Sequence, residues 1–245
     1  MIGSKQISKS LNASKTKYML FGHKQPEPGH ALSIGSEKLE KVQSTKFLGI
    51  IIDDKLKWNA HIDYCKKKIS SGVYEMNASK HILSSNHLRI LYHSLVQSYL
   101  NYGTLLWGNT YQKYIKQLEV QQKKAIRCIY KANYNAHTSP LFKDSRVLKL
   151  KDVHRFQLDV MAYNFMNANL PSPLQRMFTR NIDMHGVNTR QINDIYLPKV
   201  NNTTVKNSFI FECPNTWIQL DSAIKTTPNE KSFKFKLKQY LMLQY

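Results

Sequence analysis

Acidic residues are scarce in this chain of 245 residues. Asp and Glu together number 16 against 36 Lys and Arg, which leaves a formal net charge of +20. Such an excess attracts polyanions, so nucleic acid is the class of partner that the composition favours. Arginine is scarce too, with seven of the 36 cations, and lysine contacts phosphates as a point charge without reading bases. Binding should therefore be largely tolerant of sequence, and the alternative, a basic surface that only keeps the chain in solution, stays open.

Cysteine and long apolar runs are sparse as well. The three cysteines, Cys65, Cys128 and Cys213, are far apart and odd in number, which excludes a disulfide framework or a zinc knuckle. A reducing compartment fits this usage. No apolar run approaches the roughly 18 residues of a membrane span, and the N-terminus has no apolar signal-peptide core. We expect an intracellular protein of the cytoplasm or nucleus, with no membrane partner.

Sequence motifs for catalysis are also missing. The chain has neither a Gly-Lys-Ser/Thr phosphate loop nor a Gly-x-Gly-x-x-Gly pattern, and its nine histidines show no pairing with Ser or Asp. Asp53 and Asp54, with Asp63 as a third carboxylate, could hold metal ions for a nuclease, but we expect the pair to form a turn that leads into a helix. His61 and Cys65 have the i, i+4 spacing of zinc ligands without further partners. We predict no metal site, and a metal nuclease is the less favoured alternative.

What is present is a β-rich start followed by helical periodicity. Residues 1–57 are predicted as short strands and turns, in which the apolar run Phe47–Ile52 suits a strand buried on both faces. Beyond residue 58 the apolar spacing becomes helical, with a polar break at Asn133–Ser139. Residues 174–230 read as irregular. The fold class is therefore α+β and mainly helical, in three regions: 1–57, 58–135 and 136–245.

Five helices are expected from the i, i+3 and i, i+4 spacing of apolar residues. The last of them, Ser232–Leu243, alternates lysine with apolar residues, so a strand is its alternative. The residues that share the apolar face of each of the others are Ile62, Cys65 or Lys66, Ile69, Val73 and Met76; Leu88, Leu91, Leu95 and Tyr99; Ile115, Leu118, Gln122, Ala125, Ile126 and Ile129; and Val153, Phe156, Val160, Met161 and Phe165.

The third helix, about Tyr111 to Lys131, carries the strongest pattern. At about 100° per residue, six cations fall within an arc of roughly 100° opposite the apolar face. Charges that only solvate a helix normally alternate in sign, and here the one acid, Glu119, lies outside the arc. We therefore predict that this arc faces phosphates. Its members are Lys113, Lys116, Lys123, Lys124, Arg127 and Lys131.

Several blocks along nearly the whole chain resemble, in order, the reverse transcriptases of non-LTR (long interspersed, jockey-like) retrotransposons. Phe47–Asp53, closed by Trp58 and then His61-Ile62, resembles the strand that follows their catalytic palm. The remaining blocks are Leu11–Phe21, Leu91–Val96 with Tyr102-Gly103 and Trp107-Gly108, Gln121–Arg127, Ala136–Phe142 and Thr189-Arg190. One block departs from the family pattern Gly-Pro-x-x-Trp-Asn-x-Leu-Pro: this chain has Cys213, Ile218 and Asp221 where the family has Gly, Asn and the second Pro.

The resemblance implies a role for each region. Residues 1–57 would be the end of the palm, with Phe47, Leu48 and Gly49 as a primer-grip-like element and Lys15 near the incoming triphosphate. Residues 58–135 would be the helical thumb that carries the basic arc, and 136–245 a C-terminal retroelement region. The implied partner is an RNA and DNA template–primer duplex.

The resemblance also implies what this chain does not carry. In the family the metal-binding aspartates precede the position of Leu11, so we expect no catalytic residue here and a truncated polymerase fragment that is not an enzyme by itself. No cofactor is expected, because Mg²⁺ is implied only for the full-length polymerase. The palm and fingers half is a possible partner. The alternative is a helical remnant or protein-interaction module that does not bind nucleic acid.

Overall fold

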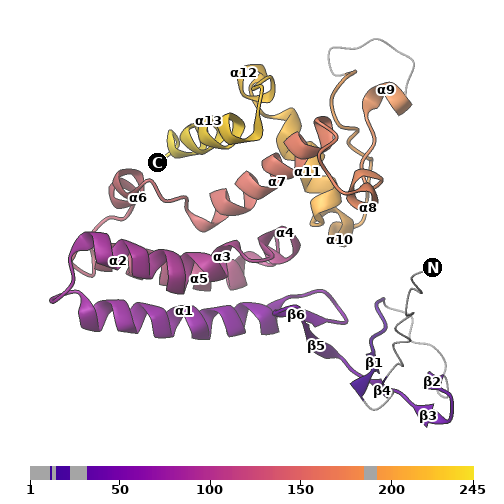
Figure 1. The fold of residues 1–245 in the computed structure, drawn as a ribbon, viewed down its shortest axis with the longest axis horizontal. Helices are drawn as coiled ribbons and strands as arrows, with labels where there is room; N and C mark the ends of the chain where they lie inside the picture. The colour runs from indigo at the N-terminus through magenta and orange to yellow at the C-terminus, as the bar shows by residue number, and fades with distance from the viewer. Residues whose placement is uncertain (1–11, 13–14, 23–31, 185–191) are drawn as a thin grey trace, which may run out of the picture. The chain divides into compact units, whose positions relative to one another are not determined.

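The structure, a computed structural model, describes residues 12, 15–22, 32–184 and 192–245, apart from the side chain of Thr204 (Figure 1). The chain divides into two compact units, Met1–His61 and Ile62–Tyr245. The predicted division into three regions stays a prediction.

The first unit contains three small sheets. β1 pairs in parallel with β4, and β2 and β3 form an antiparallel hairpin within Leu32–Leu39. β5 and β6 form a longer antiparallel hairpin. The bounds of the strands are β1 Lys17–Tyr18, β2 Ser33–Ile34, β3 Glu37–Lys38, β4 Glu40–Lys41, β5 Ser44–Phe47 and β6 Ile50–Asp53.

The apolar run Phe47–Ile52 corrects one prediction, because it is not a single strand buried on both faces. Phe47 ends β5 and Ile50 begins β6, and the two residues pair directly. Leu48 and Gly49 make the turn between them with φ of 46° and 84°. Positive φ at both central residues is typical of the type I′ turn, which matches the twist of a two-stranded hairpin. The exposed fractions of Phe47 and Leu48 are 61% and 74%, so the tip is apolar and open.

Asp53 takes the structural role that the sequence predicts. Its Oδ1 accepts hydrogen bonds from the backbone N–H of Lys55 and Lys57 at 3.2 and 3.0 Å, and its Oδ2 accepts from Trp58 N–H at 2.8 Å. Leu56 and Trp58 have φ of 50° and 62°, a conformation that side chains disfavour. The carboxylate therefore holds the turn that leads β6 into the first helix.

Helices make up the second unit, and the fold class is α+β and mainly helical, as predicted. Among the described residues, no helix has the length and apolarity of a membrane span. The helices, of which the first begins in the other unit, are α1 Asn59–Ser79, α2 Ser85–Tyr92, the π-helical turn η2 His93–Gln97, α3 Ser98–Asn101, α4 Thr104–Trp107, α5 Gln112–Ile129, α6 Ser139–Ser145, α7 Leu150–Met166, α8 Ser172–Gln175, α9 Asn181–Met184, α10 Thr203–Lys206, α11 Phe209–Ile218, α12 Ser222–Lys225 and α13 Glu230–Met242.

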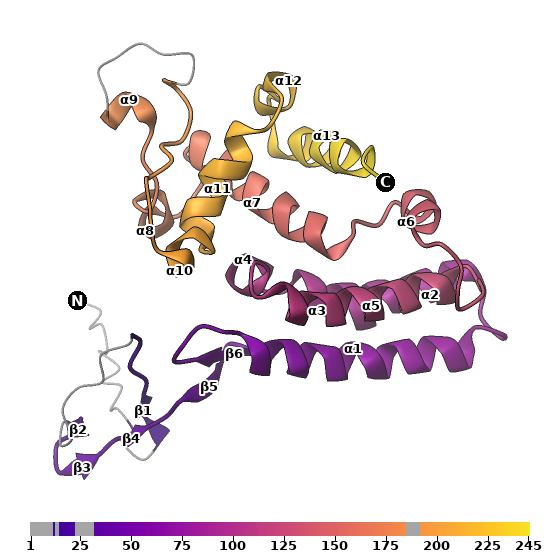
Figure 2. The same cartoon turned by 180° about the vertical axis from the view of Figure 1, so that it is seen from behind.

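α1, α2 and α5 share a core, and α1 lies beside α5 in both ribbon views (Figures 1 and 2). The predicted apolar faces of α1 and α5 are buried, as the spacing indicated. In the second helix the prediction was partly wrong: the fully buried residues are Leu88, Tyr92, Val96 and Leu100. The π-helical turn interrupts α2 after Tyr92 and shifts the buried positions beyond it.

Gln122 is the polar residue in this core. Its Nε2 donates to the hydroxyl of Tyr92 and to the carbonyl of Leu148, both at 3.0 Å, and its Oε1 accepts from Leu150 N–H at 3.0 Å. The Tyr92 hydroxyl in turn donates to Gln97 Oε1 at 2.6 Å. One amide thereby connects α5 to α2 and to the first residue of α7.

A second core surrounds α7. α7 packs against α3, α4, α11 and α13 (Figure 2). The buried residues of this core include Leu158, Phe165, Trp217 and Phe233. The prediction that residues 174–230 are irregular missed α11, which contains Pro214 in its interior. Its 4-residue spacing, Phe209, Cys213 and Trp217, was the available signal. The prediction of a helix for the last segment is confirmed by α13.

Replacing Gln122 tests its role in the first core. We expect Gln122→Leu to lower the free energy of unfolding by about 2–4 kcal/mol, because it leaves the buried Leu148 carbonyl and Leu150 N–H unpaired. Tyr92→Phe should cost about 1 kcal/mol. Urea denaturation followed by circular dichroism measures both. The control, Gln121→Leu on the less buried side of α5, should change stability by about 0.5 kcal/mol or less, and an equal loss in Gln121→Leu would contradict this role.

Asp159 on α7 is fully buried, and its Oδ2 lies 3.7 Å from Arg155 Nε. Burial raises the pKa of the carboxyl from its ordinary value of 3.8 to about 6, although Thr216 and Arg155 act in the opposite direction. Since the folded-state pKa is the higher one, folding favours the protonated acid. The stabilisation that comes from protonated Asp159 is fully present below the ordinary pKa of 3.8 and is lost as pH rises through about 6.

Asp159→Asn should remove this pH dependence. We expect the free energy of unfolding of the variant, relative to the parent, to rise by about 2–3 kcal/mol from about pH 4 to about pH 8. Urea denaturation across that range measures the difference. The exposed Asp183→Asn is the control and should show a flat difference; a flat difference for Asp159→Asn would mean that its carboxyl is not perturbed.

Candidate nucleic-acid interface

The basic arc of α5 lies on the side of the helix away from its buried residues. Lys113, Lys116 and Lys123 are exposed, whereas Lys124 and Arg127 are half-buried. Lys113 Nζ lies 4.9 Å from the ring centroid of Tyr114, within range of a cation–π contact. The helical part of the arc therefore presents cations to solvent, as an electrostatic contact with phosphates requires.

Lys131 does not share this helical face. α5 ends at Ile129, and Lys131 has a φ of 50°, so it belongs to the turn after the helix. Its N–H donates to Cys128 O at 3.1 Å, and Ala132 N–H donates to Arg127 O at 3.0 Å, which closes the helix end. The prediction placed Lys131 on the arc because it extended the helical period two residues too far.

Arg127 has a structural contact that the sequence did not reveal. Its Nε donates to the carbonyl of Ala136 at 2.9 Å, across the loop that follows α5. Ala136 N–H donates to Asn133 O at 3.0 Å, so the loop closes on itself as well as on the helix. Arg127 thus positions this loop in addition to carrying charge.

Two pockets flank the arc. The first, of about 470 Å³, lies between α5 and the segment from the loop to the start of α7, and Lys123, Arg127, Lys149 and Lys151 line it together with Glu119. Residues 149 and 151, which sequence reasoning did not select, therefore add to the same basic surface. They are distant in sequence from the helix, so no local pattern could have found them.

Lys149 is held firmly in this first pocket. Its Nζ lies 3.2 Å from Ser139 Oγ and 4.1 Å from the ring centroid of Tyr245. The Tyr245 hydroxyl accepts from Lys149 N–H and donates to Asp152 Oδ2, both at 2.7 Å. Burial lowers the pKa of Lys149.

The second pocket, of about 430 Å³, lies between α1 and the C-terminal end of α5. The two helices run parallel here: Lys66 Nζ donates to Gln117 Oε1 at 2.8 Å, and Cys128 Sγ lies 3.9 Å from Asn77 Oδ1. The lining residues are Ser70, Val73, Tyr74, Asn77, Lys80, Gln121, Lys124, Arg127, Cys128, Ala132 and Tyr134. Tyr74, Lys80 and Tyr134 are further residues that sequence reasoning missed.

The primer-grip-like residues and Lys15 belong to the first unit. Phe47, Leu48 and Gly49 form the hairpin tip described above. Lys15 is exposed, and its N–H donates to the carbonyl of Asn12 at 3.2 Å. Of the resembling blocks, Thr189-Arg190 and the residues Leu11, Ala13 and Ser14 lie outside the described residues.

The candidate metal ligands of the sequence have packing roles. His61 is buried, and its Nδ1 accepts from Ile51 N–H at 3.3 Å; burial, then the charge of Lys46, lowers its pKa to about 4. Burial raises the pKa of Cys65 to about 12, so its thiol stays protonated. Within the described parts of the chain, no three His, Cys, Asp or Glu side chains are grouped as metal ligands.

Two curated proteins are similar to part of this chain. The RNA-directed DNA polymerase from mobile element jockey of Drosophila melanogaster is 27% identical over 146 residues, which are 58% of this chain and 16% of the relative. The protein of the same name from Drosophila funebris is 26% identical over 147 residues, with the same shares. No protein-family model matches the chain, and no solved structure matches it.

These relatives correct the expectation that the chain is not an enzyme. Both are named RNA-directed DNA polymerases, so the matched region belongs, in each relative, to an enzyme. The expectation was wrong because it inferred the activity of a protein from motifs missing in one stretch of sequence. The finding and the sequence blocks agree on the type of polymerase. This chain contains a region related to the reverse transcriptases of jockey-like, non-LTR retrotransposons.

Proposed function

We propose that this chain serves as part of an RNA-directed DNA polymerase and binds its template–primer duplex through the basic face of α5. The observation that carries the proposal is the exposure of Lys113, Lys116 and Lys123 along one side of a helix whose opposite side is buried. Such a row lets several ammonium groups reach successive phosphates at once. Because lysine carries no base information, the contact suits an enzyme that must copy any sequence.

The surroundings of the face support this proposal. Lys149 and Lys151 line the pocket beside Lys123, which extends the positive surface past α5. Phosphate contacts fix the position of a duplex without specifying its sequence. The relatives add independent support, because both are named RNA-directed DNA polymerases.

In the same proposal, the hairpin tip Phe47–Gly49 contacts the primer end and Lys15 lies near the incoming triphosphate. The tip has the exposure that such a contact needs, since Phe47 and Leu48 are open to solvent. An apolar tip packs on sugars and bases and leaves the phosphates to the lysines. Lys15 is exposed as well, so its ammonium group is accessible to a phosphate.

The salt dependence of binding tests the α5 face. With four to six cations engaged, the logarithm of the association constant for B-form duplex should fall against the logarithm of salt concentration with a slope of roughly −4 to −5. Changing Lys113, Lys116 and Lys123 together to Gln should flatten the slope by about 2–3 units. Helix content should be kept, because glutamine is a good helix former. Fluorescence anisotropy of a labelled duplex measures the slope.

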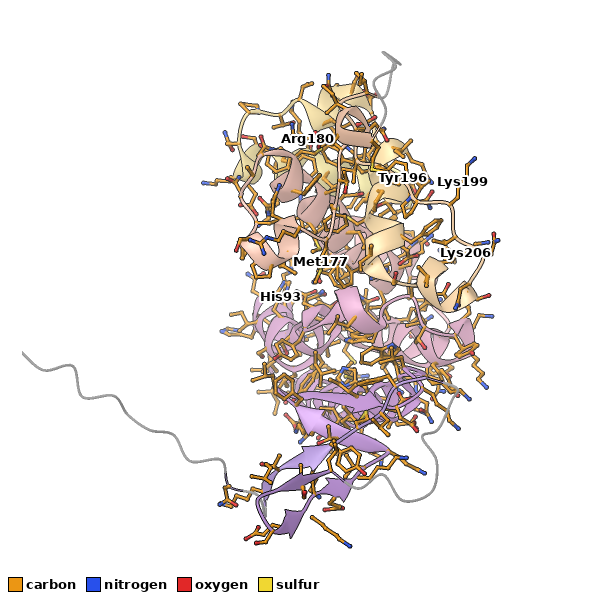
Figure 3. All side chains as sticks on the ribbon, turned by 90° about the vertical axis from the view of Figure 1, so that its right-hand side faces the viewer. His93, Met177, Arg180, Tyr196, Lys199 and Lys206 are labelled. Carbon is orange, nitrogen blue, oxygen red and sulfur yellow. The ribbon has the colours of Figure 1, made fainter. Side chains whose placement is uncertain are left out.

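The matched control changes three exposed lysines elsewhere in the same unit, Lys199, Lys206 and Lys231, to Gln. Figure 3 shows the side chains of Lys199 and Lys206 extending outward from the ribbon. All three lysines follow α7 in the chain, far in sequence from α5. Both triples remove the same charge, so a general effect of net charge would flatten both slopes equally. Equal flattening would refute the assignment to α5, and absence of binding by the parent protein would refute the proposed function itself.

A further inference from the structure

Two exposed aromatic rings border one pocket. The exposed fractions of Tyr74 and Tyr134 are 75% and 77%, and both line the second pocket, between α1 and the end of α5. They come from segments about 60 positions apart in the chain. Most aromatic side chains of that size are buried in a folded domain. Two tyrosines that stay open at one concave site are available for stacking on a planar ligand.

The pocket forms because two polar helix stripes face each other. On α1, Ser70, Tyr74 and Asn77 follow the i, i+4, i+7 spacing of one face, and Val73 lies beside them. Val73 and Cys128 are buried and supply an apolar floor. The floor and the rings suit a flat, weakly polar group.

The rim of the pocket is cationic. Lys80 comes from the end of α1, and Lys124 and Arg127 come from α5. Among the residues that line it, no side chain is acidic. The first pocket differs in both respects, since it includes the acidic Glu119 and the ring of Phe142 that lines it is only 1% exposed. An anionic ligand with a planar group therefore fits the second pocket better than the first.

The position of Tyr134 is held from two sides. At Lys131, the positive φ changes the direction of the chain after α5. The hydrogen bond from Arg127 Nε to the Ala136 carbonyl then fixes the following loop against the helix. The turn closed by Ala136 N–H and Asn133 O places Tyr134 at its tip. Arg127 is thus a positioning residue for the ring as well as a cation on the rim.

We propose that this pocket binds one unpaired nucleotide of a single strand, with its base stacked on Tyr74 and Tyr134 and its phosphate beside Lys80, Lys124 and Arg127. The volume of about 430 Å³ is within the range of small-ligand pockets. Combining aromatic faces with a positively charged rim is the usual way to bind single strands without sequence preference. The inference rests on the proposed function and deepens it: α5 binds the duplex on its exposed face, and its other edge takes the strand that is not yet, or no longer, paired.

The test compares blunt duplex with the same duplex carrying a single-stranded overhang that contains 2-aminopurine. The parent protein should bind the overhang substrate more tightly, and stacking should quench the 2-aminopurine fluorescence. In the double variant Tyr74→Ala, Tyr134→Ala, we expect affinity for the overhang substrate to fall by about tenfold or more, and the quenching to be lost. Affinity for blunt duplex and the salt slope should stay unchanged. The pair Tyr74→Phe, Tyr134→Phe keeps both rings and should behave as the parent.

The control double variant, Tyr102→Ala with Phe235→Ala, removes two exposed aromatic rings outside the pocket and should leave overhang binding and quenching unchanged. Unaltered overhang binding by Tyr74→Ala, Tyr134→Ala would overturn the stacking site while leaving the proposed function in place. Equal weakening of blunt and overhang substrates would overturn it too, since stacking acts on unpaired bases only. If the parent protein binds neither substrate, the proposed function fails, and this inference fails with it.

Discussion

The amide of Gln122 is the interaction on which the arrangement of the second unit depends. A buried polar group is costly unless it is hydrogen-bonded, and this one is bonded to a hydroxyl on α2 and to two backbone groups around the start of α7. Hydrogen bonds add a constraint of direction that apolar contacts between helices do not supply. With Gln122 inside, a rotation of α5 would break three hydrogen bonds. The amide therefore decides which side of α5 faces solvent, and so where its lysines point.

The charge of the chain is accommodated by separating cations from the core. In the interior, both ring nitrogens of His154 have polar neighbours: Nε2 lies 2.8 Å from Glu212 Oε2 and Nδ1 lies 2.9 Å from the Thr104 carbonyl. The lysines of α5 extend outward, where water screens their mutual repulsion. A surface with so many like charges gains most when a polyanion neutralises it. The same separation thus leaves the cationic surface that the proposed duplex would neutralise.

Lysine and arginine side chains differ in mobility and contacts at the proposed interface. The exposed lysines carry their charge at the end of a flexible side chain, which suits contact with phosphates at variable positions. Arg127 is instead fixed by the carbonyl of Ala136, and it shapes the loop that carries Tyr134. A planar guanidinium can hold a backbone carbonyl and still present charge. One residue thereby links the cationic face to the aromatic pocket.

The sequence by itself determined the features that repeat within a few residues. The helical period placed α1, α5, α7 and α13, and it identified the buried face of α5 and most of its basic arc. Period alone could not end α5 before Lys131, nor divide the run Phe47–Ile52 at Leu48-Gly49, because a turn depends on backbone angles that apolar spacing does not encode. Only the tertiary structure brought Tyr74 to Tyr134 and Lys149 to Lys123. The proximity of these residue pairs depends on how α1, α5 and α7 pack. That packing rests on contacts between segments far apart in the chain, such as the hydrogen bonds of Gln122.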